Sequence, residues 1–214
     1  MARILITNDD GIDAPGIIAL ARSVVEDGHD VILAAPLHEA SGSGSAIGYL
    51  VDGTRIRYER RDLDGLSGVP AFGVEGPPGR CVLLAFLEAF GPRPDLVLSG
   101  INPGINTGRG LQHSGTVGAV LAASDFGISG MAISIDVPGA LADAKWSTAT
   151  AVVRRSLPFL VAAPRKTALN VNVPDRPFEE LRGVRAGRIS AFGPNTTGVV
   201  HDEPGFMRMT VTPR

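Results

Sequence analysis

Short apolar runs alternate along the chain with longer segments in which apolar residues recur at helical spacing. The short runs predict buried strands at 3–6, 31–35, 95–99, 131–137 and 167–173. Helical spacing predicts helices at 15–28, 79–90, 114–127 and about 145–162. We expect Pro158 to interrupt the last helix and the strand at 167–173 to be central in the sheet. This alternation is typical of an α/β fold with a mostly parallel sheet.

The remaining segments are less regular. Segments 54–63 and 69–74 predict short strands at the periphery, because charged residues flank the apolar ones in the first of them. From Pro174 onward, glycine and proline are frequent and no long element is indicated, so we expect turns and short strands. The prediction is therefore one domain, 1–214, with a core at 1–173 and an irregular or hairpin tail at 174–214.

Composition narrows the class of protein. The formal net charge is -2, from 20 basic and 22 acidic side chains, which gives no general attraction to nucleic acid or to an anionic membrane. A single cysteine, Cys81, excludes an internal disulfide, and its place on an apolar helical face predicts a core residue. The N-terminus reads directly into a strand with no leader pattern, so we expect a soluble, cytoplasmic protein with no membrane or nucleic-acid polymer as partner. His201 carries no functional signal.

Three polar loops follow predicted parallel strands, at 8–11, 41–45 and 99–106. Loops at the carboxyl ends of such strands meet at one edge of the sheet. Asp9 and Asp10 lie in the first loop, and a hard divalent cation would relieve the repulsion between two neighbouring carboxylates. The Ser41 hydroxyl and the Asn102 amide would complete an oxygen-only site, which favours Mg²⁺, Mn²⁺ or Ca²⁺ over Zn²⁺. The alternative for Asp9 and Asp10 is simple capping of the helix at Pro15.

A second candidate feature is the sequence SGT at 114–116, at the start of a predicted helix. Backbone N–H groups and two hydroxyls at a helix start suit a phosphate, although Ser114 also fits an ordinary N-cap. Asn102 and Asn106 can equally serve as turn formers, and His113 is either a proton donor to a leaving group or a residue of the rim. No P-loop and no dinucleotide fingerprint is present. A metal site combined with a phosphate cradle indicates a phosphoester hydrolase.

With these loops assembled, the sequence strongly resembles the SurE family of metal-dependent survival-protein nucleotidases. The segments ILITNDDGIDAPGI, AAPLHEASGSGSAI, PDLVLSGINPGIN and HSGTVGAVLAA occur in that family's order. The resemblance implies metal ligands at Asp9, Asp10, Ser41 and Asn102. It implies phosphate-binding positions at Asn106, Ser114, Gly115 and Thr116, with Asn8 lining the site.

The resemblance also implies a Rossmann-like three-layer sandwich and one divalent ion per subunit, Mg²⁺ or Mn²⁺, with Ca²⁺ possible in crystals. The implied activity is hydrolysis of nucleoside 5'- and 3'-monophosphates by a homo-oligomer, a dimer or tetramer. Four positions depart from the family pattern: Gly110, His113, Pro77 and Arg80. The C-terminal extension, which exchanges between subunits in the family, is expected to be shortened here.

The favoured mechanism has a metal-activated water attacking phosphorus, with Asp9 as general base and Asp10 as the second catalytic carboxylate. Direct attack by an aspartate to form an acyl phosphate stays open. A rival hypothesis is a nucleotide-binding protein with weak or lost catalysis, since several departures fall near the site. A haloacid-dehalogenase-type phosphatase would need a D-x-D spacing, which Asp9 and Asp10 do not have.

Overall fold

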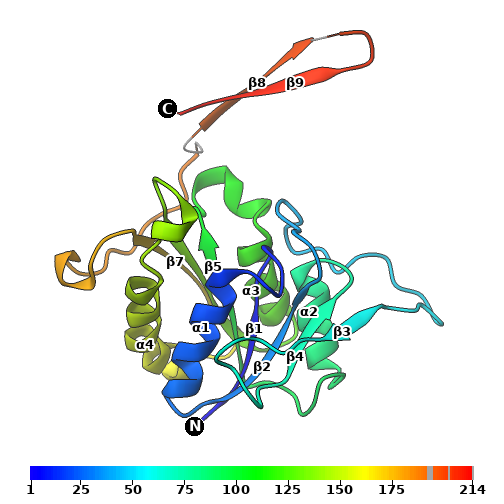
Figure 1. The fold of residues 1–214 in the computed structure, drawn as a ribbon, viewed down its shortest axis with the longest axis vertical. Coiled ribbons are helices and arrows are strands. Elements are labelled where there is room, and N and C mark those ends of the chain that lie inside the picture. Colours follow the sequence, from blue (N-terminus) through cyan, green and yellow to red (C-terminus); the bar gives the residue numbers. More distant parts are fainter. Residues whose placement is uncertain (192–194, 202, 214) are drawn as a thin grey trace.

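The computed structural model describes residues 1–191, 195–201 and 203–213, and a seven-stranded sheet forms its centre (Figure 1). Six strands run parallel in the order β4-β2-β1-β5-β6-β7, and β3 pairs antiparallel with β4 at one edge. The sheet strands are β1 (Arg3–Thr7), β2 (Asp30–Pro36), β3 (Tyr58–Arg60), β4 (Ala71–Val74), β5 (Leu96–Pro103), β6 (Ser129–Asp136) and β7 (Ala168–Pro174).

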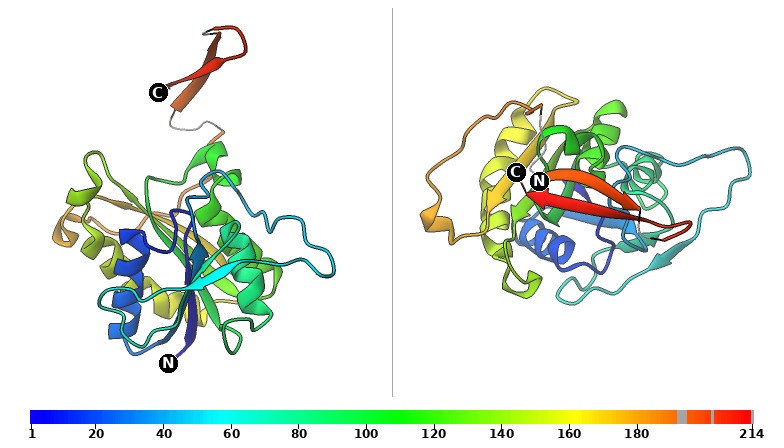
Figure 2. Two further views of the ribbon diagram at one scale, coloured as in Figure 1. Left: turned by 45° about the vertical axis from the view of Figure 1, so that its right-hand side comes forward. Right: turned by 90° about the horizontal axis from the view of Figure 1, so that it is seen from above.

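Helices cover both faces of this sheet, as the views in Figures 1 and 2 agree. The α-helices are α1 (Pro15–Glu26), α2 (Pro78–Phe86), α3 (Gly115–Asp125) and α4 (Trp146–Ala162). Short 3-10 helices are η1 (Gly108–Gln112), η2 (Leu141–Asp143) and η3 (Phe178–Glu180). Because successive strand residues face opposite sides, Ile4 and Ile6 pack in the core with α1 and α4, while Leu5 packs in a second core with α2 and α3. The three-layer α/β prediction is confirmed.

Four predictions about single elements differ from the structure. Strand β7 is the outermost strand and not a central one, since residues 168–172 are exposed or half-buried and only Val173 is fully buried. Strand β5 continues to Pro103, past a register shift between Ser99 and Asn102. Helix α2 ends at Phe86, and α4 continues without a break through Pro158, so the surrounding packing outweighs the hydrogen bond that proline removes.

The C-terminal segment, for which turns, short strands or a hairpin are predicted, contains two strands. Strands β8 (Asn195–His201) and β9 (Met207–Pro213) form an antiparallel hairpin, which stands away from the sheet in Figures 1 and 2. Residues 192–194, 202 and 214 of the predicted tail, and the side chain of His201, lie outside the described residues. In the described parts of the chain, no helix is both long enough and apolar enough to cross a lipid bilayer.

Glycines allow helix α3 to lie against the loop that follows β2. A Cβ added at Gly118 would lie 2.0 Å from the carbonyl oxygen of Gly44. We therefore expect Gly118→Ala to lower the free energy of unfolding by about 1–3 kcal/mol, although alanine is the better helix former. The matched control is Gly110→Ala, because a Cβ at Gly110 meets none of the described residues within 4 Å. Equal chemical-denaturation midpoints for the two variants would contradict the close approach.

Candidate metal and phosphate site

The turn after β1 presents the two neighbouring carboxylates. The Asn8 amide donates to the Gly11 carbonyl at 2.9 Å and accepts from the Gly11 N–H at 3.2 Å. Gly11 has a φ of 106°, a conformation that L side chains rarely adopt. Asn8 is fully buried, so its side chain closes the turn that carries Asp9 and Asp10, in addition to any role at the phosphate.

Asp9 is fixed from two sides. Its side chain is 3% exposed, and its Oδ1 accepts a 2.7 Å hydrogen bond from the Thr116 hydroxyl of α3. A Cβ at Gly115 would lie only 2.8 Å from Asp9 Oδ2, so the absence of a side chain there lets the start of α3 approach the carboxylate. The structure thus brings Asp9, Gly115 and Thr116 together, as the sequence predicts.

Asp10 has the electrostatics of an incomplete cation site. Its Oδ2 is buried and has no hydrogen-bond partner among the described residues. Burial, and then the negative charges of Asp9 and Glu39, raise the pKa of Asp10 from 3.8 to about 7. A buried, unpartnered oxygen beside a second carboxylate fits a hard divalent cation. Within the described chain no cluster of three or more His, Cys, Asp or Glu occurs, so hydroxyl and amide oxygens would have to complete the site.

The loop at 41–45 brings a second serine, Ser43, close to the site in addition to the predicted Ser41. Ser41 is exposed and follows Ala40, whose N–H donates to the Asp9 carbonyl at 2.7 Å. Ser43 Oγ is buried, has no hydrogen-bond partner in the described structure, and lies 2.8 Å from the point where a Gly115 Cβ would stand. Ser41 stays a predicted ligand. Ser43 was missed, although the repeated S-G-S-G pattern offers either serine.

The extension of β5 positions two asparagines. Asn102 donates through its amide nitrogen to the Gly104 carbonyl at 2.5 Å, so its amide oxygen is the atom left for the predicted role as a ligand. The Asn106 amide nitrogen donates to Ser134 Oγ at 2.8 Å and more weakly to Thr116 Oγ1 at 3.5 Å. Asn106 therefore lies beside the Thr116 hydroxyl that holds Asp9.

The edge strand β7 clamps the backbone of Asn106. Its N–H donates to Asn172 Oδ1 at 2.9 Å, and its carbonyl accepts from the amides of Asn170 and Asn172 at 3.0 Å each. Sequence reasoning missed Asn170, Asn172 and Ser134. The alternation of asparagine and valine in NVNV was the available signal, because it places both amides on one face of the strand.

Ser114 begins α3 as an N-cap. It is largely buried, and its Oγ accepts from the Val117 N–H at 3.1 Å. This confirms the capping interpretation and directs the free N–H groups of the first helical turn toward the side where Asp9 lies. The positive end of the helix dipole and these donors suit an anion beside the two carboxylates. A cation would have to neutralise the charge of those carboxylates before an anion could bind there.

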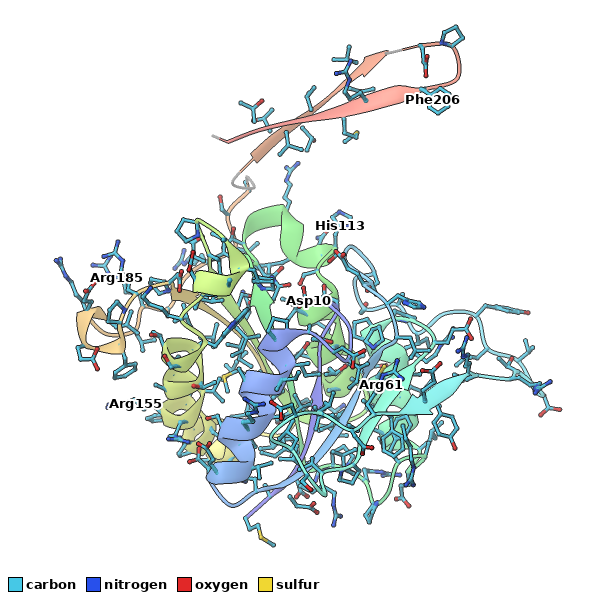
Figure 3. All side chains as sticks on the ribbon, viewed as in Figure 1. Asp10, Arg61, His113, Arg155, Arg185 and Phe206 are labelled. Atoms are coloured by element: carbon cyan, nitrogen blue, oxygen red, sulfur yellow. The ribbon has the colours of Figure 1, made fainter. Side chains whose placement is uncertain are left out.

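Two of the four positions that depart from the family pattern, Arg80 and Pro77, have a visible structural role. Arg80 donates to the carbonyls of Ile47 and Glu75, each at 2.9 Å, and so ties the loop after β2 to α2. Pro77 is the N-cap position of α2, and His113 is exposed and lies above Asp10 in the view of Figure 3. Cys81 is fully buried, as predicted, and burial raises the pKa of its thiol to about 12.

Known proteins resemble this chain over most of its length. The family model described as "Survival protein SurE" matches residues 4–194. A "5'-nucleotidase SurE" of Desulfatibacillum aliphaticivorans is 41% identical over 86% of this chain and 70% of that protein. A "5'/3'-nucleotidase SurE" of Cronobacter sakazakii is 35% identical over 94% of this chain and 75% of that protein.

A solved structure gives the same result for the fold. The crystal structure of the SurE protein from Aquifex aeolicus superposes with a TM-score of 0.78 at 28% identity, covering 99% of this chain and 82% of that chain. The superposition and the family match therefore agree on the α/β fold described above. The chain belongs to the SurE family of survival proteins.

Proposed function

We propose that this protein is a divalent-metal-dependent phosphomonoesterase that hydrolyses nucleoside 5'- and 3'-monophosphates to nucleosides and phosphate. The observation that carries the proposal is the buried, unpartnered Asp10 oxygen beside Asp9, at the start of α3. Two charges that repel and a helix end that attracts anions are compatible in one place when a cation lies between them. The relatives named 5'-nucleotidase and 5'/3'-nucleotidase support the substrate class.

The ion would be held by the carboxylates of Asp9 and Asp10, the Ser41 hydroxyl and the Asn102 amide oxygen. We propose one ion per subunit, Mg²⁺ or Mn²⁺, with Ca²⁺ as a crystal substitute, because all four ligand atoms are oxygens. When bound, such an ion supplies Lewis-acid polarisation of the phosphoryl group and lowers the pKa of a coordinated water.

The protein's own groups do the orienting. Backbone N–H groups of Gly115 and Thr116, with the Ser114 hydroxyl, would hold the phosphoryl oxygens at the start of α3. The second amide hydrogen of Asn106 makes only the weak contact to Thr116, so it is available to the phosphate. Asp9 would accept the proton of the attacking water, and the Thr116 hydrogen bond fixes its orientation.

The test is phosphate release from 5'- and 3'-nucleoside monophosphates by chelator-treated protein, with single divalent ions added back. We expect release only with added metal. Nucleotide binding without release under every ion would favour the alternative, a nucleotide-binding protein with weak or lost catalysis. The rim positions Gly110, His113, Pro77 and Arg80 would then be the first to restore to the family pattern.

We also propose a homo-oligomer, a dimer or tetramer, built on one domain with its core at 1–173 and its tail at 174–214. The hairpin exposes apolar side chains, among them Val199 at 53% and Met209 at 62%. Phe206, labelled in Figure 3, is 65% exposed. An isolated two-stranded hairpin is at best marginally stable in water, so a second copy of the chain would cover it. The cytoplasmic location stays a prediction.

The oligomer prediction can be tested on a cross-strand pair of the hairpin. Val199 lies opposite Met209, and we expect Val199→Glu with Met209→Glu to reduce the mass measured by light scattering to that of one chain. The matched control is Val184→Glu, at a residue that is 94% exposed outside the hairpin, which should leave the mass unchanged. A wild-type protein that is already monomeric would refute the proposal.

A further inference from the structure

A cavity of about 400 Å³ lies next to Asp10 at the start of α1. This volume is typical of small-molecule sites, which span roughly 300–1,000 Å³. One wall is apolar and consists of Ile12, Leu37, Leu141 and Trp146. The side chain of Trp146, the first residue of α4, is only partly buried, so part of the indole remains accessible.

The cavity adjoins the proposed metal and phosphate site and shares Asp10 with it. Asp10 and Gly11 line the cavity, whereas Asp9 faces the other way, toward Thr116 and Gly115. A phosphate ester bound at the start of α3 would therefore have its phosphorus near the carboxylates and its leaving group on the cavity side. The mechanism described above leaves this cavity without a role.

We propose that this cavity holds the nucleoside of the substrate, with the base against Trp146 and Leu141. The inference rests on the proposed function and extends it by naming the residues that select the leaving group. A flat aromatic base suits an indole and aliphatic wall, because aromatic faces stack and apolar area is removed from water. A small leaving group such as glycerol would fill little of this volume.

The charge of the cavity selects a neutral leaving group. Its other lining residues include the carboxylates of Asp10, Asp13 and Glu39. Arg61 pairs with Asp13 at 3.4 Å and offsets part of this charge, but the Asp13 side chain remains 64% exposed. Ribose hydroxyls can donate to carboxylates, whereas a second phosphate placed here would be repelled. We therefore expect AMP to be hydrolysed with a higher kcat/KM than ADP or ATP.

Binding can be measured without turnover, because Trp146 is the single tryptophan of the chain. Chelator-treated protein is titrated with AMP, adenosine and inorganic phosphate while tryptophan emission is recorded, with an inner-filter correction on free tryptophan. We expect a saturable change with AMP and adenosine and none with phosphate alone. If AMP and adenosine both leave the emission unchanged, the cavity does not hold the nucleoside and the inference is wrong.

Kinetics give an independent readout through the preference for AMP over glycerol phosphate, taken as the ratio of the two kcat/KM values. We expect Trp146→Ala to lower this ratio at least about tenfold, mainly through KM for AMP, and Trp146→Phe to restore most of it. Leu141→Ala serves as a second variant, since its side chain is 42% exposed and truncation there is tolerated by the fold. The matched control is Phe159→Ala, an aromatic residue of the same helix that is 77% exposed and does not line the cavity.

The outcomes separate this inference from the proposed function. Suppose that both cavity variants hydrolyse glycerol phosphate with added metal and keep the AMP to glycerol phosphate ratio of kcat/KM within twofold of wild type. This result would refute the nucleoside-binding role of the cavity and leave the phosphatase proposal standing. A saturable adenosine signal in a protein that hydrolyses no phosphate ester would refute the catalytic proposal and support the cavity. If Leu141→Ala loses the adenosine-dependent change in tryptophan emission and also lowers the preference for AMP, both the cavity inference and the proposed function are supported.

Discussion

Asp9→Asn is expected to lower metal-dependent kcat/KM for nucleoside monophosphates at least about 10³-fold, which corresponds to about 4 kcal/mol of transition-state stabilisation. Asparagine keeps the size of the side chain and an oxygen that can accept from Thr116, so the fold should tolerate the change. It removes the charge that would bind the ion and the basicity that would take the proton. The measurement is steady-state phosphate release at saturating metal, with circular dichroism as a check of folding.

The control for this variant is Asp52→Asn, since Asp52 is an exposed acid of a loop and lies outside the site. It should leave kcat/KM within twofold of wild type. Turnover by Asp9→Asn at the wild-type rate would remove Asp9 from the mechanism. Trapping of a phosphorylated aspartate during wild-type turnover would replace the water mechanism with direct attack.

Asp10→Asn is expected to act in opposite directions on activity and on stability. Metal-dependent activity should fall at least about 10²-fold, because a charged ligand is lost. The metal-free protein should become more stable at pH 8 by about 2 kcal/mol, after allowance for the solvent that still reaches the group. The cause is the buried, unpartnered carboxylate, whose pKa of about 7 shows that the fold favours its protonated form.

The sign of the pH dependence follows from linkage. The pKa of Asp10 is higher in the folded state than its ordinary value of 3.8, so its contribution to stability is full below pH 4 and is lost as the pH rises through about 7. Metal-free wild type should therefore lose stability over this range relative to Asp10→Asn, and added Mn²⁺ should restore it above pH 7. If the free energies of unfolding of the two proteins change in parallel across pH 4–8, burial does not destabilise the charged form of Asp10.

Most of the fold can be predicted from the sequence because apolar residues form short runs in its strands and recur at helical spacing in its helices. Ile4, Leu5 and Ile6 form a fully apolar run, which only a strand covered on both faces can bury. The edge position of β7 was mispredicted because its short strand pattern was taken as central, whereas the alternation of asparagine and valine is typical of a strand with one exposed face. The length of β5 was missed because glycine and proline around Asn102 suggest a loop.

The structure brings some of the predicted site residues together, although their roles stay predictions. Asp9, Gly115 and Thr116 lie together because a turn and a helix start meet at one sheet edge. Ser43 was not predicted because the burial of its hydroxyl depends on how closely α3 approaches the loop after β2. The glycines of α3 are the only sign of this approach in the sequence. The NVNV alternation places Asn170 and Asn172 on one face of β7, but nothing local in the sequence says that Asn172 pairs with Asn106, 66 residues away.

If Asn106 binds the phosphate as proposed, its hydrogen bonds to Asn170 and Asn172 make activity depend on the register of the outermost strand. A slip of β7 by one residue would turn Asn170 and Asn172 away from Asn106, because the side-chain period of a strand is two. Edge strands open more readily than central ones, since only one neighbour holds them. Loss of enzymatic competence on heating would therefore begin with this strand, at a temperature where the remainder of the sheet is still folded.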